Sequence, residues 1–224
     1  MTGVQVYRGR APTLAADREA TQSFVERAGE RGEPGVRVWQ PQPHVAFGRR
    51  DANREGYERA RESATRSGYE AVERSVGGHA VAFTGTTVAF ALAEPVEDVR
   101  SGIHERYDRV TGLVEAALGA LGVDAARGEP DGSFCPGSHS LSADGKIVGL
   151  AQRVRTDVAV TSGVVVVRDH REIAAVLDPI YDALDVAFDP DSVGSIARAG
   201  GESNPEEVVE TLIEHLAGDA LRET

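Results

Sequence analysis

The single cysteine of the chain, Cys135, lies in a segment rich in glycine, proline and serine, GSFCPGSHS (132–140). Loops carry side chains into clefts more readily than core strands do, so this setting favours a reactive thiol. A thiolate is a nucleophile suited to covalent catalysis. The alternative is that Cys135 fills space as a small buried hydrophobe, as free cysteines often do. His139 in the same segment could act as a base, although a solvated loop histidine is the more ordinary interpretation.

Lys146 is the only lysine among 24 basic residues. It follows a predicted tight turn at Asp144–Gly145 and begins a predicted strand over 146–155, one face of which can point into a pocket. Arginine occupies every other basic position, so the remaining lysine suggests a role that a guanidinium cannot fill. A solvated surface lysine is the alternative. An ammonium close to Cys135 would favour the thiolate.

Two adjacent glycines, Gly77 and Gly78, separate predicted strands over 69–74 and 79–84. Glycines let the backbone approach a ligand closely and present its N–H groups. Arg74, just before them, could hold a carboxylate or a phosphate. On spacing alone, a plain glycine turn is the favoured interpretation.

Helices and strands are expected to alternate irregularly along the chain. Apolar residues recur at helical spacing over 13–28, 53–67, 103–121, 171–177 and 205–216. Further strands are predicted over 36–39, 44–48, 86–92, 141–143 and 158–167. The stretch VAFTGTTVAFALA predicts a central hairpin that turns at Gly85. Hairpins between helices indicate an α+β fold, with a mixed, largely antiparallel sheet packed by helices. We expect one domain over 1–224, with a core over about 36–167 and a small helical C-terminal tail over 168–224.

The composition excludes several classes of function. The formal net charge is -12, which makes nucleic acids and anionic membranes unfavourable partners. The N-terminus MTGVQVYRGRAP lacks a hydrophobic signal core, and no apolar run is long enough to span a bilayer, so we expect a cytoplasmic protein. A single cysteine cannot form an internal disulfide. The histidines and Cys135 lack the spacing of a metal site, so no metal is expected.

Three segments together resemble a known family. RSVGGHAV (74–81) and DGKIVGLAQR (144–153) are similar to the arginine-glycine-glycine and lysine motifs of lipoate-protein ligases and octanoyl or lipoyl transferases. The Cys-Pro-Gly loop before the lysine strand resembles one branch in particular, the amidotransferases that move an octanoyl or lipoyl group from the glycine-cleavage H protein. The resemblance covers roughly residues 39–167. It implies the α+β catalytic domain shared with biotin ligases, the biotin/lipoate A/B protein ligase fold.

The resemblance also implies roles for individual residues. Cys135 would accept the acyl group as a thioester, and Lys146 would favour its thiolate and bind the acyl carbonyl. The substrate-binding residues would be Arg74, Gly77, Gly78, His79, Gly137 and Gly149. The acceptors would be lipoyl-domain proteins, such as the H protein and the E2 subunits of 2-oxoacid dehydrogenases, with acyl carrier protein as a further candidate donor. The transferase route needs no cofactor.

Two other functions remain open. An ATP-dependent lipoate-protein ligase, or its catalytic subunit, would use Lys146, ATP and magnesium and would not need Cys135. Three differences from the ligase pattern count against it. His79 stands where many ligases have a third glycine, Phe83–Thr84 replaces His-Asp, and His139–Ser140 replaces Asn-Asp. We also expect no additional C-terminal ligase domain after the last strand. A non-catalytic binder of lipoylated domains is the third possibility, and octanoyl, lipoyl and biotinyl groups all remain candidate substrates.

Overall fold

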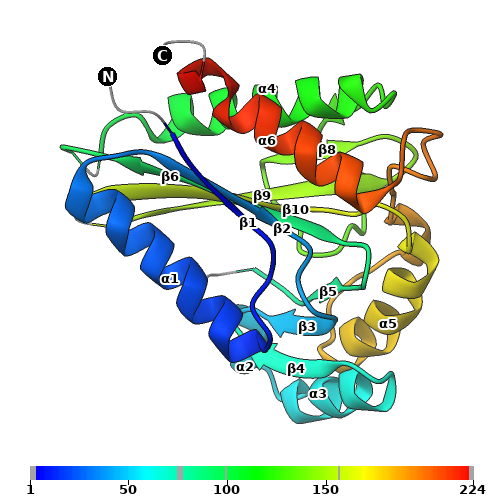
Figure 1. Cartoon of the computed structure of the whole chain (residues 1–224). Helices are drawn as coiled ribbons and strands as arrows, with labels where there is room; N and C mark the ends of the chain where they lie inside the picture. The colour runs from blue at the N-terminus through cyan, green and yellow to red at the C-terminus, as the bar shows by residue number, and fades with distance from the viewer. Residues whose placement is uncertain (1–3, 75–77, 99, 156, 222–224) are drawn as a thin grey trace.

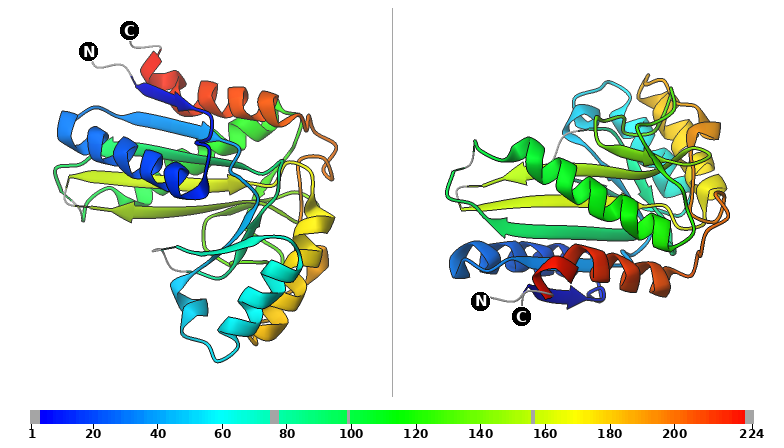
Figure 2. Two further views of the ribbon diagram at one scale, coloured as in Figure 1. Left: turned by 60° about the horizontal axis from the view of Figure 1, so that its bottom comes forward. Right: turned by 90° about the horizontal axis from the view of Figure 1, so that it is seen from above.

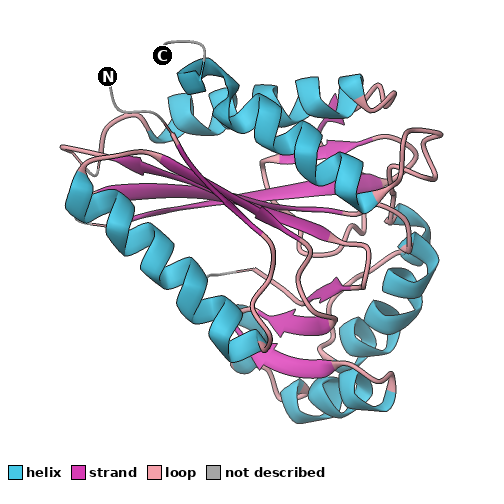
Figure 3. Cartoon of the chain, in the orientation of Figure 1, coloured by secondary structure: helices cyan, strands magenta, loops and turns pink. Residues whose placement is uncertain are grey.

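The computed structural model describes residues 4–74, 78–98, 100–155 and 157–221, with side chains through Gly218. Its strands form two sheets (Figures 1 and 3). The large sheet contains β1 (Gln5–Arg8), β2 (Gly35–Trp39), β6 (Val88–Pro95), β7 (Ala126–Arg127), β8 (Ser140–Ser142), β9 (Lys146–Val154) and β10 (Val158–Val165). The small sheet contains β3 (His44–Phe47), β4 (Glu70–Glu73) and β5 (Val81–Phe83).

The helices are α1 (Leu14–Arg31), α2 (Arg49–Ala52), α3 (Tyr57–Arg66), α4 (Ile103–Ala120), α5 (His170–Ala183) and α6 (Pro205–Leu221), with a 3-10 turn η1 (Pro190–Ser192). The large sheet runs in the order β1-β2-β6-β10-β9-β8-β7 and is antiparallel except for the β1–β2 pair. The small sheet runs β4-β3-β5, with β3 and β4 parallel. The expected α+β fold with a mixed, largely antiparallel sheet is therefore confirmed.

The two faces of the large sheet have different partners. Helices α4 and α6 lie side by side across one face, and α1 packs on the other (Figures 1 and 2). Helices α3 and α5 cover the small sheet, which lies on the α1 side of the large one. Between the two sheets lies a pocket whose lining includes residues of β6, β9, β10 and α1. None of the described helices has the length and apolar character needed to cross a membrane.

The predicted central hairpin does not form. Strand β5 pairs with β3 in the small sheet, whereas β6 pairs with β2 and β10 in the large one. The turn itself is present, because the Thr87 N–H donates to the Thr84 carbonyl and the Thr84 N–H donates to Thr87 Oγ1. The segment 81–95 therefore crosses from one sheet to the other. Both halves are apolar, and β propensity cannot tell which neighbour each will pair with.

Two predicted helices have different bounds in the structure. The expected helix over 53–67 begins later, as α3 at Tyr57, and residues 53–56 form a break between it and the preceding short helix α2. A Cβ atom at Gly56 would lie 1.6 Å from the Ala183 carbonyl oxygen, so the backbone of this break packs directly on the end of α5. Helix α5 continues beyond the predicted end and through Pro179. Ile180 and Tyr181 after that proline are fully buried, and their packing outweighs the cost of a proline inside a helix.

A buried ion pair joins α1 to the large sheet. Arg37 of β2 donates from Nη2 to Asp17 Oδ1 at 2.6 Å, and both side chains are less than a tenth exposed. Nη1 donates to the Asp17 carbonyl and to Thr21, and the guanidinium stacks 4.2 Å from the Trp39 ring centre. These contacts set the position of α1 over the face of the sheet that carries Trp39.

Replacing Arg37 with methionine would leave the Asp17 carboxylate buried without its cation. We expect this to lower the free energy of unfolding by about 3–5 kcal/mol, measured by urea denaturation. Arg66→Met is the control, because its partner Glu62 lies 3.9 Å away in a pair that is about two-thirds exposed. That change should cost no more than ~0.5 kcal/mol. Equal urea midpoints for the two variants would contradict a structural role for the Arg37–Asp17 pair.

Candidate active site

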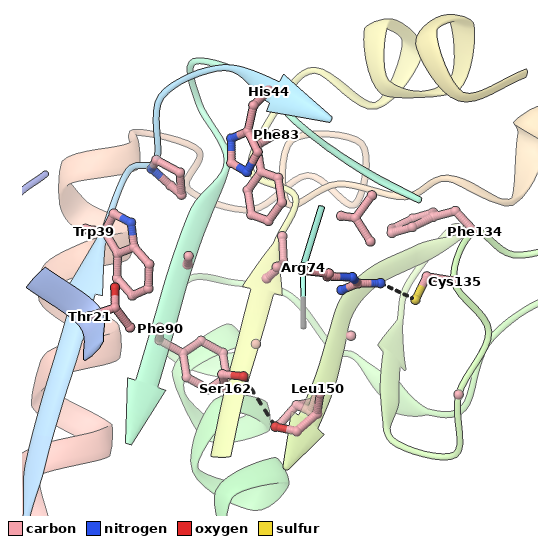
Figure 4. Close-up of a pocket in the computed structure, with 18 of the residues that line it drawn as sticks. Thr21, Trp39, His44, Arg74, Phe83, Phe90, Phe134, Cys135, Leu150 and Ser162 are labelled. Carbon is pink, nitrogen blue, oxygen red and sulfur yellow. Dashed lines mark hydrogen bonds between the residues drawn. The ribbon is translucent and has the colours of Figure 1, made fainter. Parts of the chain in front are cut away.

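A pocket of about 290 Å³ occupies the space between the two sheets (Figure 4). Most of its wall is apolar, and Arg74 and Cys135 lie together at one end, whereas Thr21, His44 and Ser162 lie elsewhere along the wall. The described residues that line it are Leu14, Asp17, Arg18, Thr21, Trp39, Pro41, His44, Arg74, Val81, Phe83, Ala89, Phe90, Phe134, Cys135, Gly137, His139, Ser140, Lys146, Gly149, Leu150, Ala151, Ser162, Gly163 and Val164.

The pairing of the central strands explains why this face of the sheet is hollow. Residues directly opposite one another on neighbouring strands point to the same face. One such row contains Ala89, Val164 and Gly149, and the next contains Ala91, Ser162 and Ala151. Small side chains on three adjacent strands leave a trough, and larger residues such as Trp39 and Phe83 form its sides.

Cys135 lies at one end of the pocket, in contact with a cation. Arg74 donates from Nη2 to Cys135 Sγ at 3.1 Å and to the His79 carbonyl at 2.6 Å. The guanidinium therefore joins the glycine segment to the cysteine loop. The guanidinium is placed to interact with negative charge that develops on the sulfur, and the cysteine is only partly buried. Arginine occupies the place beside the sulfur that the sequence analysis gave to Lys146.

The backbone of Cys135 has a left-handed conformation, with φ of 41°, which is uncommon for residues other than glycine. Its N–H donates to the Tyr181 hydroxyl at 2.6 Å, and that hydroxyl donates to the Ala80 carbonyl at 3.0 Å. Burial raises the pKa of Tyr181 well above 10, and a charge on Cys135 raises it further. Tyr181 therefore stays protonated and connects the cysteine loop to the segment before β5.

Lys146 is buried, which excludes the surface position considered from sequence. Its ammonium donates to Glu129 Oε2 at 2.6 Å and to the carbonyls of Phe134 and Cys135 at 3.0 Å each. The Phe134 ring centre lies 5.1 Å from Nζ. The three protons of the ammonium thus have three acceptors, two of them in the backbone of the cysteine loop.

The glycines expected to bind substrate have different surroundings. A Cβ atom at Gly78, whose φ is 93°, would lie 2.7 Å from Cys135 Sγ, so this position must be glycine for the sulfur to stay where it is. Gly149 lies on the pocket floor, where a Cβ would be 3.4 Å from Lys146 Cε. Gly137 is exposed and donates its N–H to Glu129. Gly77 lies outside the described residues.

The two histidines that the sequence singled out do not contact the sulfur in any described hydrogen bond. His79 Nδ1 lies 2.7 Å from Oδ1 of the fully buried Asp51, and only its carbonyl reaches Arg74. His139 stacks on Tyr107 with ring centres 3.7 Å apart. Burial lowers the pKa of His139, which keeps the ring neutral at neutral pH.

Sequence reasoning missed three residues that hold the site together: Asp51, Glu129 and Tyr181. None is the only residue of its type, and none belongs to the motifs that resemble the family. Tyr181 lies 46 residues beyond Cys135, in the part of α5 that follows Pro179. Glu129 is only six residues before Cys135, but nothing in the sequence marks it as the partner of Lys146. Within the described part of the chain, no group of three or more His, Cys, Asp or Glu side chains could hold a metal ion.

Comparison with known proteins identifies the family of the chain. Residues 12–217 match the family defined as the lipoyl protein ligase A/B catalytic domain. The chain belongs to this family, which confirms the resemblance of its motifs. It is 34% identical over 127 residues to an octanoyl-GcvH:protein N-octanoyltransferase of Geobacillus kaustophilus, covering 56% of this chain and 45% of that one. It is 36% identical over 143 residues to the enzyme of the same name from Kyrpidia tusciae, covering 62% and 48%.

The chain spans about half the length of these curated relatives. Among solved structures, a lipoate-protein ligase A bound with ATP superposes with a TM-score of 0.76 at 18% identity, over 99% of this chain and 86% of that one. At this identity the likeness shows the fold alone.

Gly78→Ala should disturb the cysteine, because the new methyl group meets Sγ and the left-handed backbone disfavours a side chain. We expect a loss of about 1–3 kcal/mol in unfolding free energy and slower alkylation of Cys135 by iodoacetamide. Gly137→Ala is the matched control in the cysteine loop, because a Cβ there meets nothing within 4 Å. Similar alkylation rates in the two variants would contradict the close contact at Gly78.

Tyr181→Phe removes one hydroxyl and leaves the Cys135 N–H and the Ala80 carbonyl without their partner. We expect a cost of about 1–3 kcal/mol in stability and an altered alkylation rate at Cys135, because the loop loses one of its anchors. Tyr57→Phe is the control, since that hydroxyl donates to the exposed Glu73 away from the pocket. An alkylation rate in Tyr181→Phe that matches the wild type would show that this hydroxyl does not hold the loop.

Proposed function

We propose that the protein is an acyltransferase that moves an octanoyl or lipoyl group onto a lysine of lipoyl-domain proteins through a thioester on Cys135. The observation that carries this proposal is the 3.1 Å contact between Arg74 Nη2 and Cys135 Sγ at one end of an apolar pocket. A thiol held beside a cation is suited to nucleophilic attack. An apolar pocket next to it suits a fatty acyl chain.

The pocket favours a chain with no charge along its length. Its floor is formed by alanine, glycine, serine and valine residues, and its sides include Trp39 and Phe83. Burying a methylene group contributes ~0.8 kcal/mol, so the seven-carbon tail of an octanoyl group would gain roughly 5 kcal/mol on entering such a pocket. A binding free energy of this size would hold the acyl carbonyl at the Arg74 end of the pocket while the bond to the donor breaks.

The reaction needs two acyl transfers with opposite proton movements. The Cys135 thiolate attacks the acyl carbonyl carbon, the C–N bond of the donor lysine amide breaks, and the leaving amine takes up a proton from solvent. The lysine amine of the acceptor then attacks the thioester, loses a proton to solvent and releases the thiolate. Arg74 stabilises the negative charge on sulfur at the beginning and end of this cycle, and its guanidinium lies beside the carbonyl oxygen as charge develops there.

The names of the curated relatives support a lipoyl-domain donor. They describe transfer of an octanoyl group from GcvH to another protein. For this chain we accordingly propose a GcvH-type H protein as the donor and E2 lipoyl domains as acceptors. An acyl carrier protein thioester is the alternative donor, and the thiolate would open that thioester more readily than an amide. The energy comes from the existing acyl bond, so this route consumes no ATP.

The contacts of Lys146 favour the transferase over the ATP-dependent ligase. In a ligase, this ammonium would have to reach phosphate or carboxylate oxygens of the bound ligand. Here its protons go to Glu129 and to the backbone of the cysteine loop. A carboxylate 2.6 Å from the ammonium also offsets the positive charge that would attract a nucleotide.

The proposal predicts an acyl-enzyme on one residue. Incubation with octanoylated H protein, or with octanoyl-acyl carrier protein, and without ATP should add one octanoyl group to the intact protein, mapped to Cys135 by mass spectrometry. Cys135→Ala should abolish both the adduct and transfer to a lipoyl domain, because no other described residue provides a thiol. Ser138→Ala, an exposed change in the same loop, should retain both.

Two results would contradict this reaction. The first is the absence of an adduct from either donor, with lipoyl-domain acylation that appears only when free lipoate and ATP are supplied. The second is undiminished transfer by Cys135→Ala. The first would make the ligase the correct function, and the second would show that transfer does not pass through a thioester on Cys135.

A further inference from the structure

Glu129 contacts the segment that follows Cys135 and the ammonium of Lys146. Its Oε1 accepts the Gly137 N–H at 2.8 Å, and its Oε2 accepts the Ser140 hydroxyl at 2.8 Å and the Lys146 ammonium at 2.6 Å. The carboxylate is 16% exposed and the Lys146 side chain 2%. Such a well-shielded carboxylate with three donors is a strong structural constraint, because charge-assisted hydrogen bonds gain strength where water is excluded.

The loop up to Cys135 depends on the same carboxylate through Lys146. The ammonium donates to the carbonyls of Phe134 and Cys135, while Glu129 holds Gly137 and Ser140, which follow them. A buried ammonium with neutral acceptors alone would be poorly compensated. Glu129 therefore keeps Lys146 in place, and Lys146 in turn holds the left-handed backbone of Cys135.

Lys146 and Arg74, both cations of the site, have different partners. Lys146 shares its charge with Glu129 and contacts only oxygen atoms of the loop, whereas Arg74 contacts Sγ directly. The sulfur stays against Arg74 only if the loop backbone does not move. We infer that Glu129 is a positioning residue for Cys135, which acts through Lys146 and the loop backbone to keep Sγ against the Arg74 guanidinium. This inference rests on the proposed function, in which Cys135 is the nucleophile.

Glu129→Gln tests the inference with little change in shape. The amide keeps one acceptor oxygen, but its NH2 group faces either Lys146 or Gly137, both donors, so part of the network is lost. At neutral pH we expect iodoacetamide alkylation of Cys135 to slow about tenfold, equivalent to about 1.4 kcal/mol. The kcat for octanoyl transfer should fall by a similar factor, with KM for the donor little changed because Glu129 does not line the pocket.

Asp131→Asn is the matched control, since it removes one negative charge from an exposed position of the same loop. Its alkylation rate and kcat should stay within about twofold of the wild type, as is usual for surface substitutions. The variant Lys146→Met and the double variant Lys146→Met/Glu129→Gln complete a double-mutant cycle. If Glu129 acts through Lys146, adding Glu129→Gln to Lys146→Met should slow alkylation little further.

The outcomes separate the inference from the proposed function. Unchanged alkylation and kcat in Glu129→Gln would overturn the inference, and so would a fall in kcat with unchanged alkylation. Additive effects in the cycle would show that Glu129 does not act through Lys146. If the wild type transfers no acyl group but Glu129→Gln still slows alkylation, the proposed function fails while the positioning role stands. If Glu129→Gln fails to fold, Ser140→Ala replaces it, with a smaller expected slowing because it removes one of the three donors to Glu129.

Discussion

An ammonium group that is shielded from water needs an acceptor for each of its protons, and this requirement organises the site around Lys146. Two of the acceptors are carbonyl groups of the cysteine loop and the third is Glu129, which itself accepts bonds from the far side of that loop. The loop, the start of β9 and the segment after β7 are therefore fixed by one charge. Sγ can meet Arg74 because the backbone that carries it has so few alternative positions.

The shape of the pocket depends on the large sheet in a different way. The trough exists because small residues of β6, β9 and β10 come into register on one face, while Val88 and Leu92 of β6 belong to the core under α4 and α6. On the opposite face, Gly163 lies across from Phe90 of the same core, and a Cβ there would lie 2.4 Å from the Phe90 ring. A shift of one residue in the pairing would turn these small side chains away from the pocket.

Much of the fold and of the candidate site could be predicted from the sequence. Cys135 and Lys146 are the only residues of their types, and Arg74 precedes a glycine pair, so rarity and local pattern marked them. The order of helices and hairpins along the sequence indicated the α+β fold. Glu129 and Tyr181 act through tertiary contacts that leave no local pattern. The same reason explains the errors at β5–β6 and in α5, because the choice of strand partner and the continuation through Pro179 depend on packing between distant segments.

Cys135 has a left-handed backbone and is followed by Pro136, which further restricts the conformations open to it. A glycine at this position would adopt the same conformation at a lower energetic cost. The nucleophile of the proposed reaction thus occupies a site where thermodynamic stability and chemistry favour different amino acids. A relative that no longer transferred acyl groups would gain stability if glycine replaced this cysteine. The hydrogen bonds of Lys146, Glu129 and Tyr181 to the loop do not involve the sulfur, so they would remain.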